Sequence, residues 1–498
     1  MTEPPIPQLS HGPRAGELHT LQIESAAVTG RGIGRVRGTL PGQERVRSWV
    51  FEAHGAHPGD TILVEATGSR KGELHGRIID IVTPSPDRTS ALCRHAGIRT
   101  DDPASGCGGC TLQTLGYPAQ LELKREFVRR ALAGQPSPEV QPTLGMEHPW
   151  RYRNKMELTF GNDYDELQLG LHPVGWKFDV FQLRQCELMG EPMLTLVDVS
   201  RRILATTGLR AWNPRKGNGT LRTLTIRRAF EPQMWMIELT TSPLEPGQES
   251  GLDAWSREVL AQWQHHHPEV PLSMHHSVHD AARGRRTEIR TRHLAGPAEL
   301  VETLTLPDTR PLRFRIGPRS FFQPNPKQAE RLYGLVVDAV QQSGIEQPRV
   351  LDLFCGTGTI GLALSSAARE VVGVDLVEQS IDDARSNAAS HGVDNTRWIA
   401  GDAAAVLESM EDRSFDVVVV DPPRVGLGDA ACDLVAGIRP RLLVYVSCNV
   451  ESMARDLARL RQSMSMTVET LQPVDMFPHT GHIECVARIR VLADAGTP

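Results

Sequence analysis

The last part of the sequence, from Arg349 onward, alternates strand with helix, and this pattern most constrains the fold. Its strand-like runs are apolar along their length, as is typical of parallel strands that are buried on both faces. These runs are RVLDLF, EVVGVD, TRWIAGD, FDVVVVDPP and RLLVYVSC, and a closing hairpin follows in MTVETLQPVDMF and HIECVARIRV. The sequence therefore predicts an α/β, Rossmann-like domain.

The chain has 498 residues, which suggests two to four domains at ~150 residues per domain. Short alternating runs with turn signals between them predict a small β-barrel of about five strands near the N-terminus. The middle region combines sequence patterns typical of β-hairpins with one predicted helix. The predicted division is a Pro-rich leader (1–18), a β-barrel (19–84), a central α+β domain (85–305) and the Rossmann-like domain (306–498).

The overall charge of the chain gives no indication that it binds a polyanion. Lys+Arg 54 against Asp+Glu 60 gives a net charge of −6. No apolar run approaches the ~18 residues of a membrane-spanning helix, and the N-terminus has no signal-peptide pattern. We therefore expect a cytoplasmic protein with no membrane partner and no evident obligate protein partner.

Two local stretches are basic although the total charge is negative. RKGNGTLRTLTIRR (215–228) holds five basic residues and no acidic one. AARGRRTEIRTR (281–292) carries Arg283, Arg285, Arg286, Arg290 and Arg292 against Glu288 alone. Each alone is compatible with a solvated hairpin face, whereas two in one region suit contacts with the phosphates of a nucleic acid.

A glycine-rich turn lies between a predicted strand and a predicted helix in LDLFCGTGTIGLAL. Gly356, Gly358 and Gly361 satisfy GxGxxG, which on its own is a weak indication of a dinucleotide site. The glycines allow a ligand to approach the backbone closely, and the helix N-terminus favours negative charge there. The turn therefore predicts a nucleotide-like cofactor.

Acidic residues follow the next three predicted strands: Asp375, Asp402 and Asp421. Asp375 comes nineteen residues after Gly356, where an acid can bind ribose hydroxyls. The alternative for each acid, and for Asp402 above all, is a helix cap. Acids after consecutive parallel strands line the crevice at the carboxyl ends of the strands.

The segment DPPR (421–424) distinguishes between cofactors. Its two prolines stiffen the backbone and remove N–H donors, so the loop can shape a flat slot for a base. Five parallel strands, a closing hairpin and DPPR together resemble the class I methyltransferase fold. This resemblance implies S-adenosylmethionine as the cofactor instead of a nicotinamide.

Two reactive side chains lie near the same predicted edge. Cys448, in YVSCN, lies where an apolar strand ends, whereas Cys355, Cys432 and Cys485 fit buried structural thiols. Glu484 lies in an otherwise apolar strand, IECVARI. An isolated buried carboxylate is costly, so Glu484 is either paired with an arginine or holds a raised pKa for a task.

The motifs FFQPNP (321–326), LDLFCGTG (351–358), DPPR, YVSCN (445–449) and MFPHTGHIE (476–484) together resemble the bacterial RNA 5-methyluridine methyltransferases. The resemblance runs from about Cys93 to the C-terminus. The N-terminal barrel resembles the TRAM domain, a small OB-like barrel that many members carry. RYRNKMELTF (151–160) resembles the central domain of the family.

The resemblance implies a mechanism and a cofactor site. Cys448 would add to carbon 6 of uracil, and Glu484 would remove the proton from carbon 5 after methyl transfer. Matching family positions that contact S-adenosylmethionine are Gln323, Phe354, Asp375 and Asp421, beside Gly356, Gly358 and Asp402 of the crevice. The family commonly has Asn where this chain has Thr359, and Glu where it has Asp375; both changes keep a polar side chain.

Four more cysteines predict a metal site: Cys93, Cys107, Cys110 and Cys186. Family members with this set use it to bind [4Fe–4S], and thiolates in this number suit iron–sulfur chemistry. The alternatives are zinc, against which the lack of a second CxxC argues, and thiols without metal. The thirteen residues between the first two cysteines exceed the usual family spacing and read as a loop insertion.

The expected partner is RNA, from which the target uridine must leave its stack to reach a thiol. The barrel with four cluster cysteines most resembles members that act on 23S rRNA, with transfer RNA as the alternative. A non-catalytic RNA-binding protein would not need Cys448 and Glu484, and an amino-group methyltransferase would need no thiol.

Overall fold

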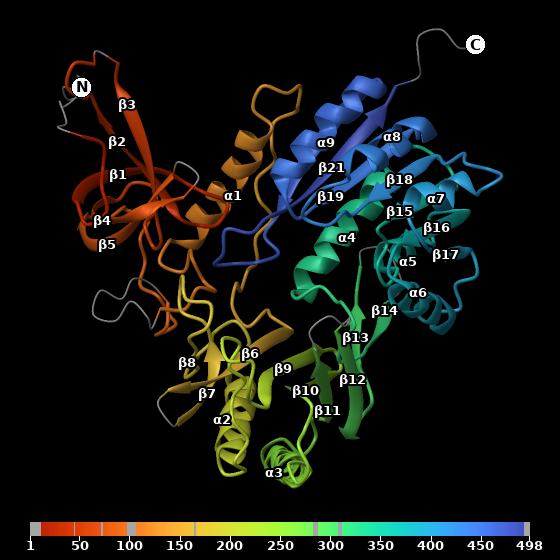
Figure 1. The fold of residues 1–498 in the computed structure, drawn as a ribbon. Helices are drawn as coiled ribbons and strands as arrows, with labels where there is room; N and C mark the ends of the chain where they lie inside the picture. The colour runs from red at the N-terminus through yellow and green to blue at the C-terminus, as the bar shows by residue number, and fades with distance from the viewer. Residues whose placement is uncertain are drawn as a thin grey trace. The chain divides into compact units, whose positions relative to one another are not determined.

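The computed structural model describes residues 11–43, 45–70, 73–96, 106–163, 166–281, 287–306 and 311–492. The chain forms two compact units (Figure 1). The first comprises Met1–Phe127, His172–Lys177 and Phe477–His482, and the second comprises the rest. The boundary between them falls within α1 (Tyr117–Ala131).

The first unit contains a closed five-stranded barrel, which confirms the prediction of a small N-terminal barrel. Its order is β1-β2-β3-β5-β4, with β1 (Leu18–Ala26), β2 (Gly32–Gly38), β3 (Arg47–Ala53), β4 (Thr61–Arg70) and β5 (Glu73–Thr83). Because side chains alternate along a strand, every second residue points inward. Leu21, Ile23 and Phe51 belong to the buried core of the barrel.

The second unit begins with a seven-stranded sheet in the order β12-β11-β10-β9-β6-β7-β8. Its strands are β6 (Lys155–Asp163), β7 (Glu166–Leu171), β8 (Phe181–Gln182), β9 (Leu221–Phe230), β10 (Gln233–Thr241), β11 (Leu272–Asp280) and β12 (Glu288–Ala295). Two helices, α2 (Glu191–Ala205) and α3 (Glu249–His266), contact each other; α2 packs on β7 and α3 packs on β11 and β12. This sheet and its helices are the central domain that the sequence predicts as α+β.

The strand pair β13 (Leu300–Leu304) and β14 (Leu312–Ile316) leads to α4 (Pro326–Gln341). The side chain of Asn325 accepts a hydrogen bond from the amide of Gln328 and so caps α4. A proline in the first turn costs no hydrogen bond, because the first amides of a helix lack partners inside it.

The Rossmann-like sheet has the order β17-β16-β15-β18-β19-β21-β20, in which only β21 runs antiparallel to its neighbours. Its strands are β15 (Arg349–Leu353), β16 (Glu370–Asp375), β17 (Thr396–Ala400), β18 (Val417–Val420), β19 (Leu442–Ser447), β20 (Met466–Val474) and β21 (Glu484–Val491). The helices are α5 (Thr359–Leu364), α6 (Glu378–Ser390), α7 (Ala403–Glu408), α8 (Gly428–Ile438) and α9 (Val450–Ser463). The parallel strands and closing hairpin confirm the predicted α/β fold class.

Helices cover both faces of this sheet. On one face α7, α8 and α9 contact one another in turn, and α9 also packs on β19. On the other face α4 contacts α5, which packs on β15 and β16. Both faces of the central strands are therefore buried, which explains why all residues of β15, β18 and β19 are apolar or buried.

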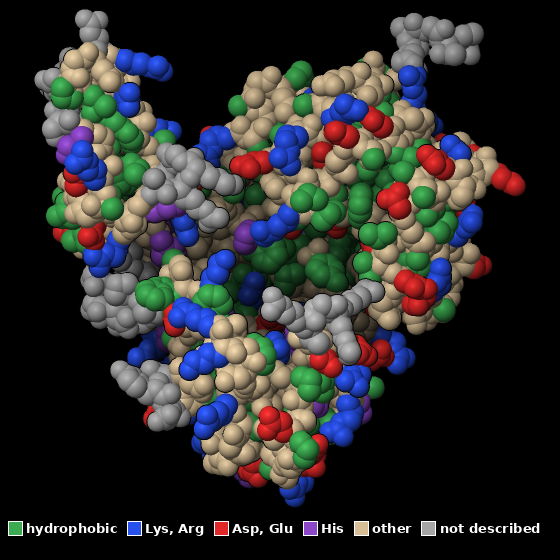
Figure 2. Space-filling view, in the orientation of Figure 1, with side chains coloured by type: hydrophobic (Ala, Val, Ile, Leu, Met, Phe, Trp, Pro, Cys, Tyr) green, Lys and Arg blue, Asp and Glu red, His purple; other side chains and the backbone are tan. Residues whose placement is uncertain are grey.

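None of the described helices is both long and apolar enough to cross a membrane. In the space-filling view, basic and acidic side chains are interspersed over the elements of the central sheet (Figure 2). The charge of this face is therefore mixed instead of carrying a single sign.

Candidate active site

The carboxyl ends of four parallel strands meet at one edge of the Rossmann-like sheet. Leu353 of β15 pairs with Val374 of β16 and with Val420 of β18, and Val420 pairs with Tyr445 of β19. The residues that follow these strands therefore gather at this edge, where open α/β sheets bind ligands.

The glycine-rich loop leaves β15 in an unusual backbone conformation. Phe354, Gly356 and Gly358 have positive φ angles of 62°, 52° and 78°. A Cβ at Gly358 would lie 2.8 Å from Trp398, whereas a Cβ at Gly356 would meet no atom within 4 Å. Gly358 is therefore required by packing, and Gly356 leaves open space for a ligand beside the backbone. The next helix, α5, begins at Thr359.

Asp375 ties this loop to the end of β16. One carboxylate oxygen accepts the amide of Gly356 at 2.9 Å, and the other accepts the amide of Val377 at 2.8 Å. Asp402 caps α7, which was the alternative interpretation of this residue. Its Oδ1 accepts hydrogen bonds from the amides of Ala404 and Ala405 at the start of the helix. A role of either carboxylate toward a cofactor stays a prediction.

Asp352 is a candidate that sequence reasoning missed. It is fully buried in β15, and within the described part of the chain no hydrogen bond of ordinary geometry reaches its carboxylate oxygens. Burial, with the charges of Asp421 and Asp375, raises its pKa to about 8, although the Gly361 amide opposes this shift. The available signal was a carboxylate inside LDLF, the same signal that identified Glu484.

Cys448 and Glu484 come together through strand register. Ser447 of β19 and Cys485 of antiparallel β21 form the last pair between these strands, so Cys448 and Glu484 are the next residues beyond it. The two side chains are close enough for the charge of Glu484 to act on the Cys448 thiol. Asp421 follows β18, the strand that pairs with β19 on its other side.

The environment of this pair disfavours negative charge. Burial, then the carboxylates of Glu484 and Asp421, raise the pKa of Cys448 to about 11, while the positive charge of Arg424 lowers it. Burial and Asp421 likewise raise the pKa of Glu484 well above its usual value, against Arg424. Burial raises the pKa of Asp421 itself to about 7. Arg424, which sequence reasoning did not single out, is thus the cation that acts on both.

Gln323 lies beside this cluster through Tyr333 of α4. The buried Tyr333 hydroxyl is hydrogen-bonded to the side chain of Gln323. Burial and the charges of Asp421 and Glu484 raise the pKa of Tyr333. The backbone carbonyl of Gln323 accepts the side-chain amide of Asn154, which fixes the loop against the central domain.

The loop that carries Arg424 is held from two sides. The side chain of Asn449 donates to the carbonyl of Arg424 at 2.8 Å. Buried Asp456 accepts the amide of Leu427 at 2.7 Å and the hydroxyl of Tyr445 at 2.6 Å. These bonds connect the loop after β18 with β19 and with the first turns of α9, so the backbone near Cys448 is well ordered.

The predicted metal ligands are distributed over both units. Cys93, Cys107 and Cys110 lie in the first unit and Cys186 in the second. Among the described residues, no group of three or more His, Cys, Asp or Glu side chains is placed to hold a metal ion. The structure therefore gives the [4Fe–4S] cluster no support, and residues 97–105 of the insertion lie outside the described part.

Two arginines of the basic stretch 215–228 make contacts inside the second unit, which does not fit their interpretation as phosphate contacts. Arg227 is buried and donates to the carbonyl of Ser320 at 2.7 Å. Arg228 donates to the carbonyl of Arg153 at 3.0 Å and stacks over Phe230. Both guanidinium groups serve packing inside the second unit. Arg283, Arg285 and Arg286 lie outside the described residues.

Comparisons with known proteins identify related methyltransferases. A family model described as tRNA (Uracil-5-)-methyltransferase matches residues 258–490. The chain is 33% identical over 485 residues to an uncharacterized RNA methyltransferase of Bacillus anthracis, covering 95% of this chain and 97% of the relative. It is 32% identical to one of Caldanaerobacter subterraneus, covering 95% and 98%.

A solved structure is also similar. The Pyrococcus abyssi tRNA (uracil-54, C5)-methyltransferase, in complex with S-adenosyl-L-homocysteine, superposes with a TM-score of 0.69 and 25% identity. The match covers 95% of this chain and 100% of that one.

The fold and the glycine-rich edge define a class I S-adenosylmethionine-dependent methyltransferase. Within this class, the chain belongs to the RNA uracil-5 methyltransferase family. The residues at this edge suit S-adenosylmethionine, because Gly356 leaves open space beside the backbone and the methyl donor carries a cationic amino group that a buried carboxylate such as Asp352 can balance.

Proposed function

We propose that the protein methylates carbon 5 of one uridine in RNA through a covalent adduct with Cys448. The observation that carries this proposal is that Cys448 and Glu484 both lie just beyond the last pair of β19 and β21, at the carboxyl end of β19. Carbon 5 of uracil is a weak nucleophile, and a thiolate bonded to carbon 6 converts the ring into an enolate that is reactive at carbon 5. S-adenosylmethionine supplies the electrophilic methyl group.

Cys448 and Glu484 would act in successive steps of the reaction. The Cys448 thiolate uses its electron pair to form a bond to carbon 6, and the π electron pair of the carbon 5–carbon 6 double bond is displaced towards the carbonyl oxygen at carbon 4. After carbon 5 has taken the methyl group, the Glu484 carboxylate removes the proton on carbon 5. The carbon 5–carbon 6 double bond forms again, and the thiolate leaves.

The raised pKa values are consistent with this division of work. A carboxylate whose pKa is raised by burial is a stronger base once it has lost its proton. A thiol with a pKa of about 11 is largely protonated at neutral pH, so the reaction depends on a cation that stabilises the thiolate. Arg424 lowers both pKa values and is the residue we assign to this role.

For the cofactor site we propose residues from four loops. Asp352 would pair with the amino group of the methyl donor, and Asp375 would bind its ribose. Asp402 and Asp421 would line the base and sulfonium ends of the crevice, with Gln323 and Thr359 as polar contacts. Phe354, Gly356 and Gly358 would shape the backbone beside it.

A direct test compares Cys448→Ala with Cys432→Ala, a buried cysteine of α8. Cys448→Ala should abolish methyl transfer, whereas Cys432→Ala should keep it. RNA containing 5-fluorouridine should trap the wild-type protein covalently, because fluorine does not leave as a proton does. Full activity in Cys448→Ala, or methyl groups on an exocyclic nitrogen, would refute the mechanism.

For the substrate we propose 23S rRNA. The barrel together with four cysteines of the predicted cluster supports this choice by resemblance. Transfer RNA is the second candidate, because both the family model and the Pyrococcus abyssi structure carry tRNA in their names. Mass-spectrometric mapping of 5-methyluridine in rRNA and tRNA from a strain that lacks the gene decides between them.

We also propose that Cys93, Cys107, Cys110 and Cys186 bind [4Fe–4S]. The support is the number of thiols and a local fold in which the amide of Cys107 donates to the carbonyl of His95, two residues after Cys93. Protein purified without oxygen should contain iron and sulfide in equal amounts, and Cys107→Ser should lose both. One zinc per chain, or no metal, would overturn this assignment.

A further inference from the structure

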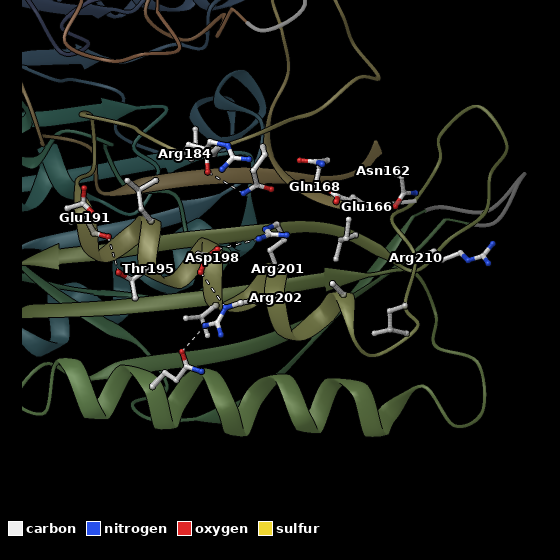
Figure 3. A pocket seen from close by; sticks show the side chains of 18 of the residues that line it. Asn162, Glu166, Gln168, Arg184, Glu191, Thr195, Asp198, Arg201, Arg202 and Arg210 are labelled. Carbon is white, nitrogen blue, oxygen red and sulfur yellow. Dashed lines mark hydrogen bonds and ion pairs between the residues drawn. The ribbon is translucent and has the colours of Figure 1, made fainter. Parts of the chain in front are cut away.

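A hollow of about 1140 Å³ lies at the edge of the central sheet, between α2, β7 and the segment after β8. Four arginines and three carboxylates line it (Figure 3): Arg184 after β8, Arg201 and Arg202 on α2, Arg210 in the loop before β9, and Glu166, Glu191 and Asp198. No residue proposed for catalysis or cofactor binding lines this hollow. It is a separate polar site on the central domain.

The hollow has unused hydrogen-bonding capacity. Arg201 shares Asp198 with Arg202, through contacts of 3.4 Å each. The Nε of Arg201 is nevertheless buried without a hydrogen-bond partner in the described part of the chain. The terminal nitrogens of a guanidinium that a carboxylate holds in place can still donate to an anionic ligand.

The loop before β9, which carries Arg210, also contacts two aromatic rings. Phe178 is an exposed residue (50%), and the guanidinium of Arg215 lies 5.0 Å from the centre of its ring. Two residues after Arg210, the ring of Trp212 carries the guanidinium of Arg222 at 4.0 Å. Phe178, Arg215 and the neighbouring exposed Lys216 form the Phe178 patch.

This loop is already ordered. The side chain of Asn213 accepts the amides of Arg215 and Lys216 at 3.0 and 3.1 Å. Asn213 also bridges to Asn218 across the turn. The backbone that carries Arg215 thus needs little reorganisation on binding, which lowers the entropic cost of a complex.

We infer that this surface, the hollow together with the Phe178 patch, binds an unpaired RNA strand outside the catalytic site. Proteins that hold single strands combine cationic grooves for phosphates with aromatic rings on which bases stack. Here Arg184, Arg201 and Arg210 would contact phosphates, and Phe178 would stack a base. The inference rests on the proposed RNA substrate and adds a second contact to it.

The exposed cations of the Phe178 patch favour RNA over a protein partner. Arg215 and Lys216 are exposed beside the exposed Phe178, and the wall of the hollow is dominated by polar side chains. A hydrophobic protein interface would need a continuous apolar core, which a single exposed ring does not supply.

The test uses two labelled probes, an oligouridylate and a blunt RNA duplex of equal length, with full-length protein. Phe178→Ala should weaken oligouridylate binding about tenfold, and Phe178→Trp should keep it, because stacking on one ring is worth ~1–3 kcal/mol. Arg215→Ala and Arg210→Ala should each reduce the slope of log affinity against log salt by about one. Arg257→Ala, on exposed α3, is the matched control and should change nothing.

Methyl transfer to a short RNA that contains only the modified uridine and its neighbours separates this inference from the proposed function. All the surface variants should methylate this short RNA like wild type. Oligouridylate affinity that is unchanged in Phe178→Ala, or lost equally for the duplex, would overturn the inference. Failure of wild type to methylate any uridine would instead refute the proposed function.

Discussion

Two fully buried aspartates, Asp60 in the barrel and Asp352 in the Rossmann-like sheet, differ in how the protein treats their charge. Asp60 accepts the amides of His57 and Ser85 and two bonds from Arg88, at 2.6–2.8 Å. Its pKa is lowered, because these hydrogen bonds outweigh burial. Asp352 has no such partner in the described chain, and its pKa is raised to about 8.

The difference between Asp60 and Asp352 shows how a structural buried carboxylate can be distinguished from a functional one. A structural carboxylate is satisfied by its own fold, whereas one that awaits a ligand is left unsatisfied. Asp421 and Glu484 belong with Asp352, because burial raises the pKa of each. Buried Arg227 also donates within the fold, to the carbonyl of Ser320.

The largest effect is expected when Asp60, the aspartate that the fold itself satisfies, is replaced. Asp60→Asn leaves the Arg88 guanidinium without its anion, and removing one partner of a buried pair costs about 3–5 kcal/mol. Urea unfolding followed by tryptophan fluorescence should show this loss at pH 7. Below the pH at which Asp60 becomes protonated in the folded protein, wild type loses the same stabilisation, so the gap should close. A gap that persists in acid would contradict the comparison.

The next largest effect is expected on cofactor affinity when Asp352 is replaced. Asp352→Asn should weaken S-adenosylhomocysteine binding about 10- to 100-fold in calorimetry, because a hydrogen bond to a charged group is worth ~1.5–3 kcal/mol. Stability at pH 7 should not fall as in Asp60→Asn, since the folded protein holds Asp352 largely protonated. Asp382→Asn, an exposed carboxylate on α6, is the control. Unchanged affinity would make Asp352 a structural residue.

A smaller effect tests the cation beside the thiol. Arg424→Gln removes the positive charge that lowers the pKa of Cys448, so this pKa should rise further above about 11. A rise of about one unit slows alkylation at pH 8 about tenfold. Peptide mass spectrometry after timed iodoacetamide treatment reports Cys448 alone. Arg397→Gln should leave the rate unchanged, and a faster rate in Arg424→Gln would reverse the assignment.

The sequence was sufficient for the α/β fold because five apolar runs, each followed by a turn, allow few other arrangements. It also singled out Cys448 and Glu484 as candidates, since one follows a strand and the other is a carboxylate in an apolar strand. It missed Asp352 because LDLF reads as core. It misread Arg227 and Arg228 because charge along a strand does not reveal which side chains are covered by distant segments.

The central claim, that Cys448 and Glu484 act at successive stages on the same uracil, is tested most directly with Glu484→Gln. The variant is incubated with RNA and S-adenosylmethionine labelled in the methyl group, then run on a denaturing gel. Because the thiol still adds but the proton on carbon 5 stays, a labelled protein–RNA adduct should accumulate, and Cys448→Ala should give none. Glu484→Gln protein that turns over normally and forms no adduct would contradict the claim.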